Sequence, residues 1–263
     1  MIKEEIFRLT LPYSDNQTKL VRVFVPEHEE GEKLPVIYMT DGQSIFEDGL
    51  NQFGSWHTRE AVRAERQNSG KAAVIVGIHN DESPVQRAND LTPKSIGELF
   101  FPPDMPEEMK KQINPKGEVF DDFIVNTVMP AVEKQFPVKT GKENTAICGS
   151  SSGGIQTFFT ALSHPDIFSA AGVFSPCFML YCKPALDSWI KSKAGSDIPF
   201  LYIYSGSADE LEKNICMSVE GTFQTLSECC PQDKLKKVIM PEQHHNEAAW
   251  EPVFRDFLSM FLT

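Results

Sequence analysis

A short serine-rich stretch near the middle of the sequence has the composition of a nucleophile turn. Residues 149–153 read GSSSG; they follow the apolar run TAIC and precede a helical segment, residues 155–163. This matches the G-x-S-x-G pattern, in which a strained strand-to-helix turn exposes the central serine at the positive end of the helix. Only Ser151 has glycine at both required positions. We therefore predict Ser151 as a nucleophile, and the alternative is a structural polar turn.

A serine hydroxyl becomes a good nucleophile when a neighbouring base takes its proton. His244 and His245 follow the apolar run at residues 236–241 and precede the final helical segment. They are adjacent in sequence, so only one of them can point into a common site. A zinc site at HHNE would need further ligands at metal spacing, and the sequence offers none.

The acid that orients this base is expected between Ser151 and the histidines, after a strand. Asp209 and Glu210 follow the apolar run at residues 200–205. A buried carboxylate bonded to an imidazole fixes its tautomer and stabilises the imidazolium. We predict Asp209 in this role, with Glu210 as the alternative. The carboxylate left over would cap or begin the next helix.

An acyl-transfer site also needs two backbone N–H groups that stabilise the oxyanion. Ser152, directly after the nucleophile, is predicted to supply one. The loop after the apolar run at residues 34–40 is predicted to supply the other, from Gln43, with Gly42 as the neighbouring alternative. Asp-Gly is also an ordinary turn pair, so this signal is modest by itself.

These residues follow short apolar runs that alternate with helical segments. The alternation predicts a mostly parallel sheet with helices on both faces, and ligands bind such sheets at the carboxyl ends of the strands. Residues 4–12 and 19–26 alternate apolar and polar side chains and are predicted to form an antiparallel edge pair. Residues 117–136 are predicted to form an amphipathic helix that Pro130 kinks.

Two loop-rich inserts, about 79–117 and 176–198, interrupt this pattern within a single predicted domain, residues 1–263. A short helix is expected around Trp189 in the second. Long loops in compact domains are usually lids or binding loops, so we expect both to wall the site. Candidate substrate-binding residues are Trp56, Arg87, Phe178 and Trp189. Each could instead be a core or structural residue, and Arg87 could instead form an ion pair that holds the long loop.

Composition narrows the possible partners. The 263-residue chain has a formal net charge of −12, which disfavours nucleic acid and anionic membranes as partners. Its apolar runs are too short to span a bilayer, and its start lacks the apolar segment of a secretory signal, so we expect a cytoplasmic protein. The six cysteines show no metal spacing and are expected to be thiols. We expect no cofactor or metal; the oligomeric state is left open.

Several stretches together resemble the putative esterase family of α/β hydrolases, which includes siderophore, feruloyl and acetylxylan esterases and S-formylglutathione hydrolases. They cover roughly residues 20–260 and read VIYMTDGQSIF, FGSWHTREAV, AAVIVGIHN, FDDFIVNTVMPAVEKQF, CGSSSGG, LSHPDIFSAAGVFSP and HHNEAAW. The resemblance implies an α/β-hydrolase fold and a serine esterase. It also implies a small or medium ester substrate, of siderophore, feruloyl, acetyl-carbohydrate or short-acyl type.

The resemblance also bears on single residues. In the family's terminal motif the base precedes the NE pair, which implies His245. The position of the family's acid implies Asp209, and the DGQ motif implies Gln43. Ser152 departs from the larger residue usual there, often Met, but only its backbone N–H is needed. Acyl transfer to an alcohol or sugar would use the same residues. A non-catalytic binding protein with this fold would need a broken triad, and all three predicted members are present.

Overall fold

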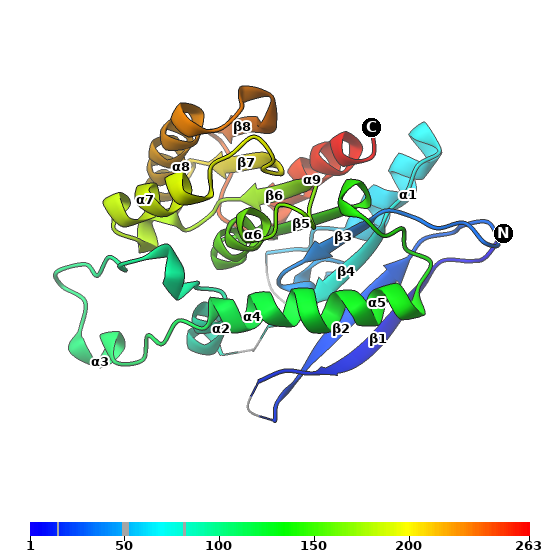
Figure 1. The fold of residues 1–263 in the computed structure, drawn as a ribbon, viewed down its shortest axis with the longest axis horizontal. Coiled ribbons are helices and arrows are strands. Elements are labelled where there is room, and N and C mark those ends of the chain that lie inside the picture. The colour runs from blue at the N-terminus through cyan, green and yellow to red at the C-terminus, as the bar shows by residue number, and fades with distance from the viewer. Residues whose placement is uncertain (15, 49–52, 81–82) are drawn as a thin grey trace.

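The computed structural model describes residues 1–14, 16–48, 53–80 and 83–263. Eight strands form one sheet in the order β1-β2-β4-β3-β5-β6-β7-β8. The strands are β1 Glu5–Pro12, β2 Thr18–Val25, β3 Val36–Met39, β4 Val74–Ile78, β5 Thr145–Ser150, β6 Ala170–Phe174, β7 Phe200–Gly206 and β8 Leu235–Met240. Figure 1 shows the sheet running through the molecule between helices.

The sheet is parallel from β4 through β8, and its N-terminal end is antiparallel. β1 pairs with β2, and β2 pairs with β4, both antiparallel, while each later neighbour pairs in parallel. The predicted antiparallel edge pair and mostly parallel sheet are confirmed. The carboxyl ends of β3 to β8 therefore meet at one edge, where the loops that follow them can build a site.

Helices cover both faces of the sheet. They are α1 Thr58–Ser69, α2 Pro84–Asp90, α3 Glu107–Lys110, α4 Gly117–Phe123, α5 Met129–Gln135, α6 Ser152–Ser163, α7 Lys183–Lys193, α8 Glu210–Cys229 and α9 Glu247–Phe261. Alternate residues of β3 show the division. Tyr38 belongs to the core that packs against α4, α6 and α8, and Ile37 to the core beneath α1 and α9. This two-sided burial explains why the central strands read as continuous apolar runs.

The predicted helix over residues 117–136 is present, with a distortion in its middle. α4 passes into a π-helical segment, Ile124–Val128, before α5 begins at Met129. Pro130 is the second residue of α5 and has no N–H to donate. Local π-helical bonding is one way a helix accommodates such an interruption.

The two inserts contain more helix than their composition predicts. The first holds α2 and α3, and the second holds α7, which includes Trp189 as expected. The inserts also contact each other, since the Tyr181 hydroxyl donates to the Pro93 carbonyl at 2.7 Å and Phe100 N–H donates to the Leu180 carbonyl at 2.9 Å. In the described part of the chain, no helix is both long and apolar enough to cross a membrane.

Candidate active site

Ser151 lies at the sharp turn between β5 and α6. Its backbone angles, φ 59° and ψ −125°, are strained for a residue with a side chain. The turn is held on both sides: Ser151 N–H donates to the Phe174 carbonyl at 3.0 Å, and the Ser151 carbonyl accepts from Ile155 N–H at 3.2 Å. The serine therefore stands at the carboxyl edge of the sheet and at the N-terminus of a 12-residue helix.

The two glycines of the motif are required by close packing against Thr40. A Cβ atom at Gly149 would lie 2.3 Å from Thr40 Oγ1, and one at Gly153 would lie 2.2 Å from the same atom. Real Cβ atoms do not approach so closely. The G-x-S-x-G spacing thus reflects the fit of the turn against the end of β3.

His245 bridges the serine and a carboxylate. Its Nε2 lies 3.0 Å from Ser151 Oγ, and its Nδ1 lies 2.9 Å from Glu212 Oε1. An ionised carboxylate only accepts, so the Nδ1 proton is donated to Glu212 and Nε2 is left to accept the serine proton. The ring of Trp250 meets the imidazole edge-on, with centroids 5.1 Å apart, and helps to hold its orientation.

The carboxylate against the imidazole belongs to Glu212, whereas the sequence predicts Asp209 or Glu210. Glu212 lies in the first turn of α8 and its side chain is fully buried. Its second oxygen lies 3.1 Å from Ser205 Oγ. The geometry therefore corrects the acid of the predicted triad from Asp209 to Glu212.

Asp209 has a different task because it is the N-cap of α8. Its Oδ1 accepts from Glu212 N–H at 2.9 Å, and its Oδ2 lies 3.1 Å from His244 Nδ1 and 3.3 Å from His245 N. The hydrogen bond from Glu212 N–H, with those from His244 and His245, holds the pKa of Asp209 below its ordinary value. Glu210 is the first, exposed residue of the helix.

A signal for Glu212 exists in the sequence. Asp209 followed three residues later by Glu212 has the spacing of a capping box, which sets the helix start at residue 210. From that start, Glu212 shares one helix face with Ile215 and Val219, and both are fully buried. A carboxylate on a buried stripe needs a partner, which marks it as a candidate for the site.

The predicted oxyanion donors lie in two helical turns that follow the neighbouring strands β3 and β5. Ser152 is the first residue of α6, and Gln43 lies in a single helical turn, Gly42–Ser44, directly after β3. N–H groups in a first turn have no partner within their own helix. The Gln43 side chain anchors its loop, accepting from Asn80 N–H at 3.2 Å and donating to Asp41 Oδ1 at 3.3 Å.

Arg87 adopts the structural role that the sequence left open. Its Nε and Nη2 donate to the two oxygens of Asp41 at 2.6 and 2.8 Å. Burial alone would raise the pKa of Asp41, but the charge and hydrogen bonds of Arg87 outweigh it and the pKa is lowered. This bidentate pair ties α2, in the first insert, to the loop that carries Gln43.

The aromatic candidates for substrate binding divide between core and cavity. Trp56 is buried and stacked on Phe174, with centroids 5.3 Å apart, and Trp189 is stacked on Phe159 at 5.6 Å. Both tryptophans therefore belong to the cores, since flat rings fill large spaces between helices. Phe178 is also nearly buried, but it lines a groove beside the site.

Cys177 is a neighbour of the serine that the sequence analysis assigned no role. Its Sγ lies 3.5 Å from Ser151 Oγ, and its N–H donates to the Ser151 carbonyl at 3.3 Å. Burial raises the pKa of the thiol. The side chain is therefore a neutral wall of the site. Among the described residues, no group of three or more His, Cys, Asp or Glu side chains could hold a metal ion.

The serine turn at residues 149–153, the histidine after β8 and the eight-stranded sheet together define an α/β-hydrolase fold. The chain belongs to the family described as "Putative esterase", whose model matches residues 15–252. An IroE-like serine hydrolase from Shewanella oneidensis has the same fold, with a TM-score of 0.75, 18% identity, and coverage of 99% of this chain and 80% of that one.

Two curated relatives are similar in sequence over part of their length. The uncharacterized protein YbbA of Bacillus subtilis is 23% identical over 74% of this chain and 72% of its own length. A siderophore enterobactin esterase of Emericella nidulans is 30% identical over 54% of this chain and 46% of its own length. The second match thus spans less than half of that relative.

Proposed function

We propose that this esterase hydrolyses carboxylic esters through an acyl-enzyme on Ser151, with His245 as the base and Glu212 as the residue that orients it. The observation that carries the proposal is the continuous chain from Ser151 Oγ to His245 to Glu212, at 3.0 and 2.9 Å. These distances are those at which a base takes a proton from a nucleophile and a third group holds the base.

In the first half of the reaction, Ser151 Oγ attacks the ester carbonyl carbon while His245 Nε2 takes the serine proton. The oxyanion that forms accepts hydrogen bonds from the N–H groups of Ser152 and Gln43. Glu212 stabilises the imidazolium without taking its proton. His245 then gives its proton to the alcohol oxygen, and the alcohol leaves behind an acyl group on Ser151.

In the second half, water takes the place of the alcohol. His245 removes a proton from the water, whose oxygen attacks the acyl carbon through a second oxyanion held by the same N–H groups. Collapse of this intermediate breaks the bond to Ser151 Oγ, which recovers its proton from His245, and the carboxylic acid leaves. No step needs a group outside the chain other than water.

Relatives guide the choice of first substrates. The Emericella relative acts on a siderophore, and a Xylanibacter ruminicola xylanase/feruloyl esterase is 33% identical over a short stretch, 22% of this chain. We therefore include trilactone and feruloyl esters beside short-acyl esters in the substrate panel. We also propose a cytoplasmic location, because all six cysteines are free thiols and such chains fit a reducing compartment.

The test compares Ser151→Ala with wild type on 4-nitrophenyl butyrate. We expect Ser151→Ala to lower kcat by about 10⁴- to 10⁶-fold, as for loss of a triad member. Ser150→Ala is the matched control, since Ser150 ends β5 and takes no part in the proposed chemistry. It should retain activity, and all three proteins should melt alike. Equal rates for wild type and Ser151→Ala would remove the proposal.

A further inference from the structure

A groove of about 650 Å³ lies between the second insert and α8, with part of the first insert along its edge. Volumes of about 300–1,000 Å³ are typical of sites that hold a drug-sized molecule. An acetyl group would leave such a space almost empty. The groove therefore has room for an occupant much larger than the smallest acyl groups.

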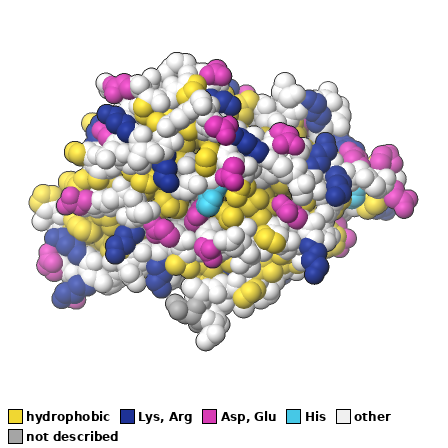
Figure 2. Space-filling model, viewed as in Figure 1, with side chains coloured by type: hydrophobic (Ala, Val, Ile, Leu, Met, Phe, Trp, Pro, Cys, Tyr) yellow, Lys and Arg dark blue, Asp and Glu magenta, His cyan; other side chains and the backbone are white. Residues whose placement is uncertain are grey.

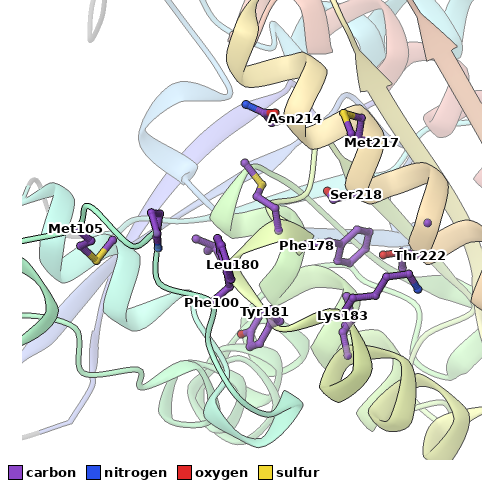
Figure 3. A pocket seen from close by; sticks show the side chains of 14 residues that line it. Phe100, Met105, Phe178, Leu180, Tyr181, Lys183, Asn214, Met217, Ser218 and Thr222 are labelled. Carbon is purple, nitrogen blue, oxygen red and sulfur yellow. The ribbon is translucent and has the colours of Figure 1, made fainter.

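One wall of the groove is a single face of α8. Asn214, Met217, Ser218, Gly221 and Thr222 line it, at spacings of three and four residues that place them on one side of a helix. Figure 3 shows Ser218 above the ring of Phe178 and Thr222 beside it.

The opposite side is built from the two inserts. Phe178, Leu180 and Tyr181 come from the second, and Phe100 and Met105 from the first. Phe100 is half exposed and Met217 more so, at 74%, so apolar groups stand on both lips. In Figure 2, hydrophobic side chains lie on both sides of a histidine near the centre of the face, and acidic side chains lie around it.

Each wall of the groove includes a residue that is close in sequence to the candidate active site. Phe178 directly follows Cys177, whose Sγ lies 3.5 Å from Ser151 Oγ. Asn214 lies two residues after Glu212, which touches His245. Each wall thus contains a residue that is one or two positions away in sequence from a residue in contact with Ser151 or His245.

The lining offers no free positive charge. Of the residues that line the groove in the described chain, Lys183 alone is charged, and its Nζ lies 2.8 and 2.6 Å from the two oxygens of Asp187. Arg87, the cation of the first insert with the strongest claim to bind substrate, is held by Asp41. An anionic group placed here would have to compete with Asp187 for Lys183.

We propose that this groove binds one uncharged, apolar arm of the ester, aliphatic or aromatic and of medium length, while the carbonyl lies at Ser151. The inference rests on the proposed function and deepens it, because it assigns a substrate class. Each buried methylene is worth about a three- to fourfold gain in binding. A longer apolar arm should therefore raise kcat/KM until the groove is filled.

The first experiment fills the groove from α8. A Cβ at Gly221 would meet only the flexible Lys183 side chain, at 3.3 Å, so Gly221→Leu can enter the groove without disturbing the core. Replacing an interior helical glycine also favours the helix. The matched control is Gln224→Leu, which adds the same side chain at an exposed position outside the lining. Both proteins should keep a wild-type melting temperature or better.

The readout is the ratio of kcat/KM for 4-nitrophenyl octanoate to that for the acetate, with acetates of ethanol and octanol as a second series. In wild type and Gln224→Leu, at least one series should favour the long arm by about tenfold or more. Gly221→Leu should lower that ratio at least fivefold. The proposal is overturned if neither series shows a preference, or if Gly221→Leu leaves the preference intact.

A second comparison tests charge at constant length. 4-Nitrophenyl valerate and the 4-nitrophenyl monoester of glutaric acid differ by a terminal carboxylate. We expect wild type to favour the valerate by about tenfold or more, because the groove has no free cation to receive the carboxylate. Equal rates, or a preference for the glutarate, would contradict an uncharged arm.

A binding measurement distinguishes a failure of the groove proposal from a failure of the proposed ester hydrolysis. The neutral amide N-phenyloctanamide has the same arm as the octanoate ester, and its binding to wild type, Gly221→Leu and Gln224→Leu can be titrated calorimetrically. Weaker binding only in Gly221→Leu supports the groove even if every ester fails to react, which would count against the proposed function alone. Equal binding to all three proteins, or no binding at all, overturns the groove as the subsite.

Discussion

Two histidine–carboxylate pairs lie side by side where the loop after β8 meets the start of α8, and we propose a catalytic role for only one of them. His245 and Glu212 are 15% and 0% exposed, and their atoms are 2.9 Å apart. His244 and Asp209 are 61% and 35% exposed, at 3.1 Å. Residue types and distances are nearly the same, so burial and the direction of each side chain distinguish the pairs.

Burial strengthens the interaction within the inner pair, His245 and Glu212. Away from water, the attraction between a carboxylate and an imidazolium is much less screened, so Glu212 can stabilise the charge that His245 would gain. The outer pair, His244 and Asp209, is exposed to solvent, where ion pairs contribute little to stability. Its carboxylate instead binds backbone groups, the N–H of Glu212 and that of His245. The outer pair thus positions the backbone from which the inner pair projects.

The largest contrast is expected between the two histidines. Among the described residues, Ser151 Oγ lies within hydrogen-bonding distance of His245 and of the neutral Cys177 thiol, and His245 is the base of the two. We therefore expect His245→Ala to lower kcat by about 10⁴- to 10⁶-fold. His244→Ala should change kcat by less than about tenfold, because its ring faces solvent and Asp209. Steady-state rates on 4-nitrophenyl butyrate measure both. Comparable losses in the two variants would mean that the pairs are not distinct.

The next-largest difference in kcat is expected between variants of the two carboxylates. Glu212→Gln keeps the shape of the side chain but removes the charge that fixes the Nδ1–H tautomer, and we expect kcat to fall by about 10³- to 10⁴-fold. Asp209→Asn should cost less than about tenfold, since Asn still caps the helix. The same assay decides. A large loss in Asp209→Asn with a small one in Glu212→Gln would restore the acid predicted from the sequence.

The sequence was most informative where local backbone geometry restricts the residue type. The turn between β5 and α6 needs glycine at two fixed positions because Thr40 leaves no room for a Cβ. That requirement is visible in the sequence as G-x-S-x-G. Apolar runs likewise predicted the strands, since β3 to β7 lie between two helical layers. The meeting of Ser151 and His245 followed from both residues being placed after parallel strands.

The sequence was less informative where the outcome depends on which way a side chain turns in a helix. Because α8 starts at residue 210, Glu212 lies on its buried stripe and Asp209 is its N-cap. A shift of one residue in a helix rotates a side chain by about 100°. Whether Trp56, Trp189 and Arg87 bind substrate or have a structural role depends on tertiary partners far away in sequence, which no local pattern reveals.

A smaller effect concerns the structural task of the outer pair. Asp209→Ala removes the oxygen that accepts from Glu212 N–H, and loss of such an N-cap costs about 1 kcal/mol. For a domain of this size we expect the melting temperature to fall by roughly 2–4 °C. Asp209→Asn is the control, because Asn caps about as well as Asp. Thermal melting followed by circular dichroism measures both, and an equal fall in the two variants would assign the effect to charge and not to the cap.

The smallest expected effect is the pH dependence of the outer pair. The folded-state pKa of Asp209 lies below its ordinary value of 3.8, mainly because its carboxylate accepts from Glu212 N–H and also from His244 and His245. A lowered folded pKa means that the ionised carboxylate stabilises the folded state above the unfolded pKa. That stabilisation disappears as the pH falls through the folded value.

The free energy of unfolding of wild type should therefore exceed that of Asp209→Asn by a small amount at about pH 5, above the unfolded-state pKa of the carboxyl. The difference should shrink at lower pH as the wild-type carboxylate becomes protonated. Urea unfolding of both proteins at a series of pH values measures it. A wild-type advantage that grows as the pH falls below about 5 would mean that the charge of Asp209 opposes folding, and the outer pair would then have no structural role through its charge.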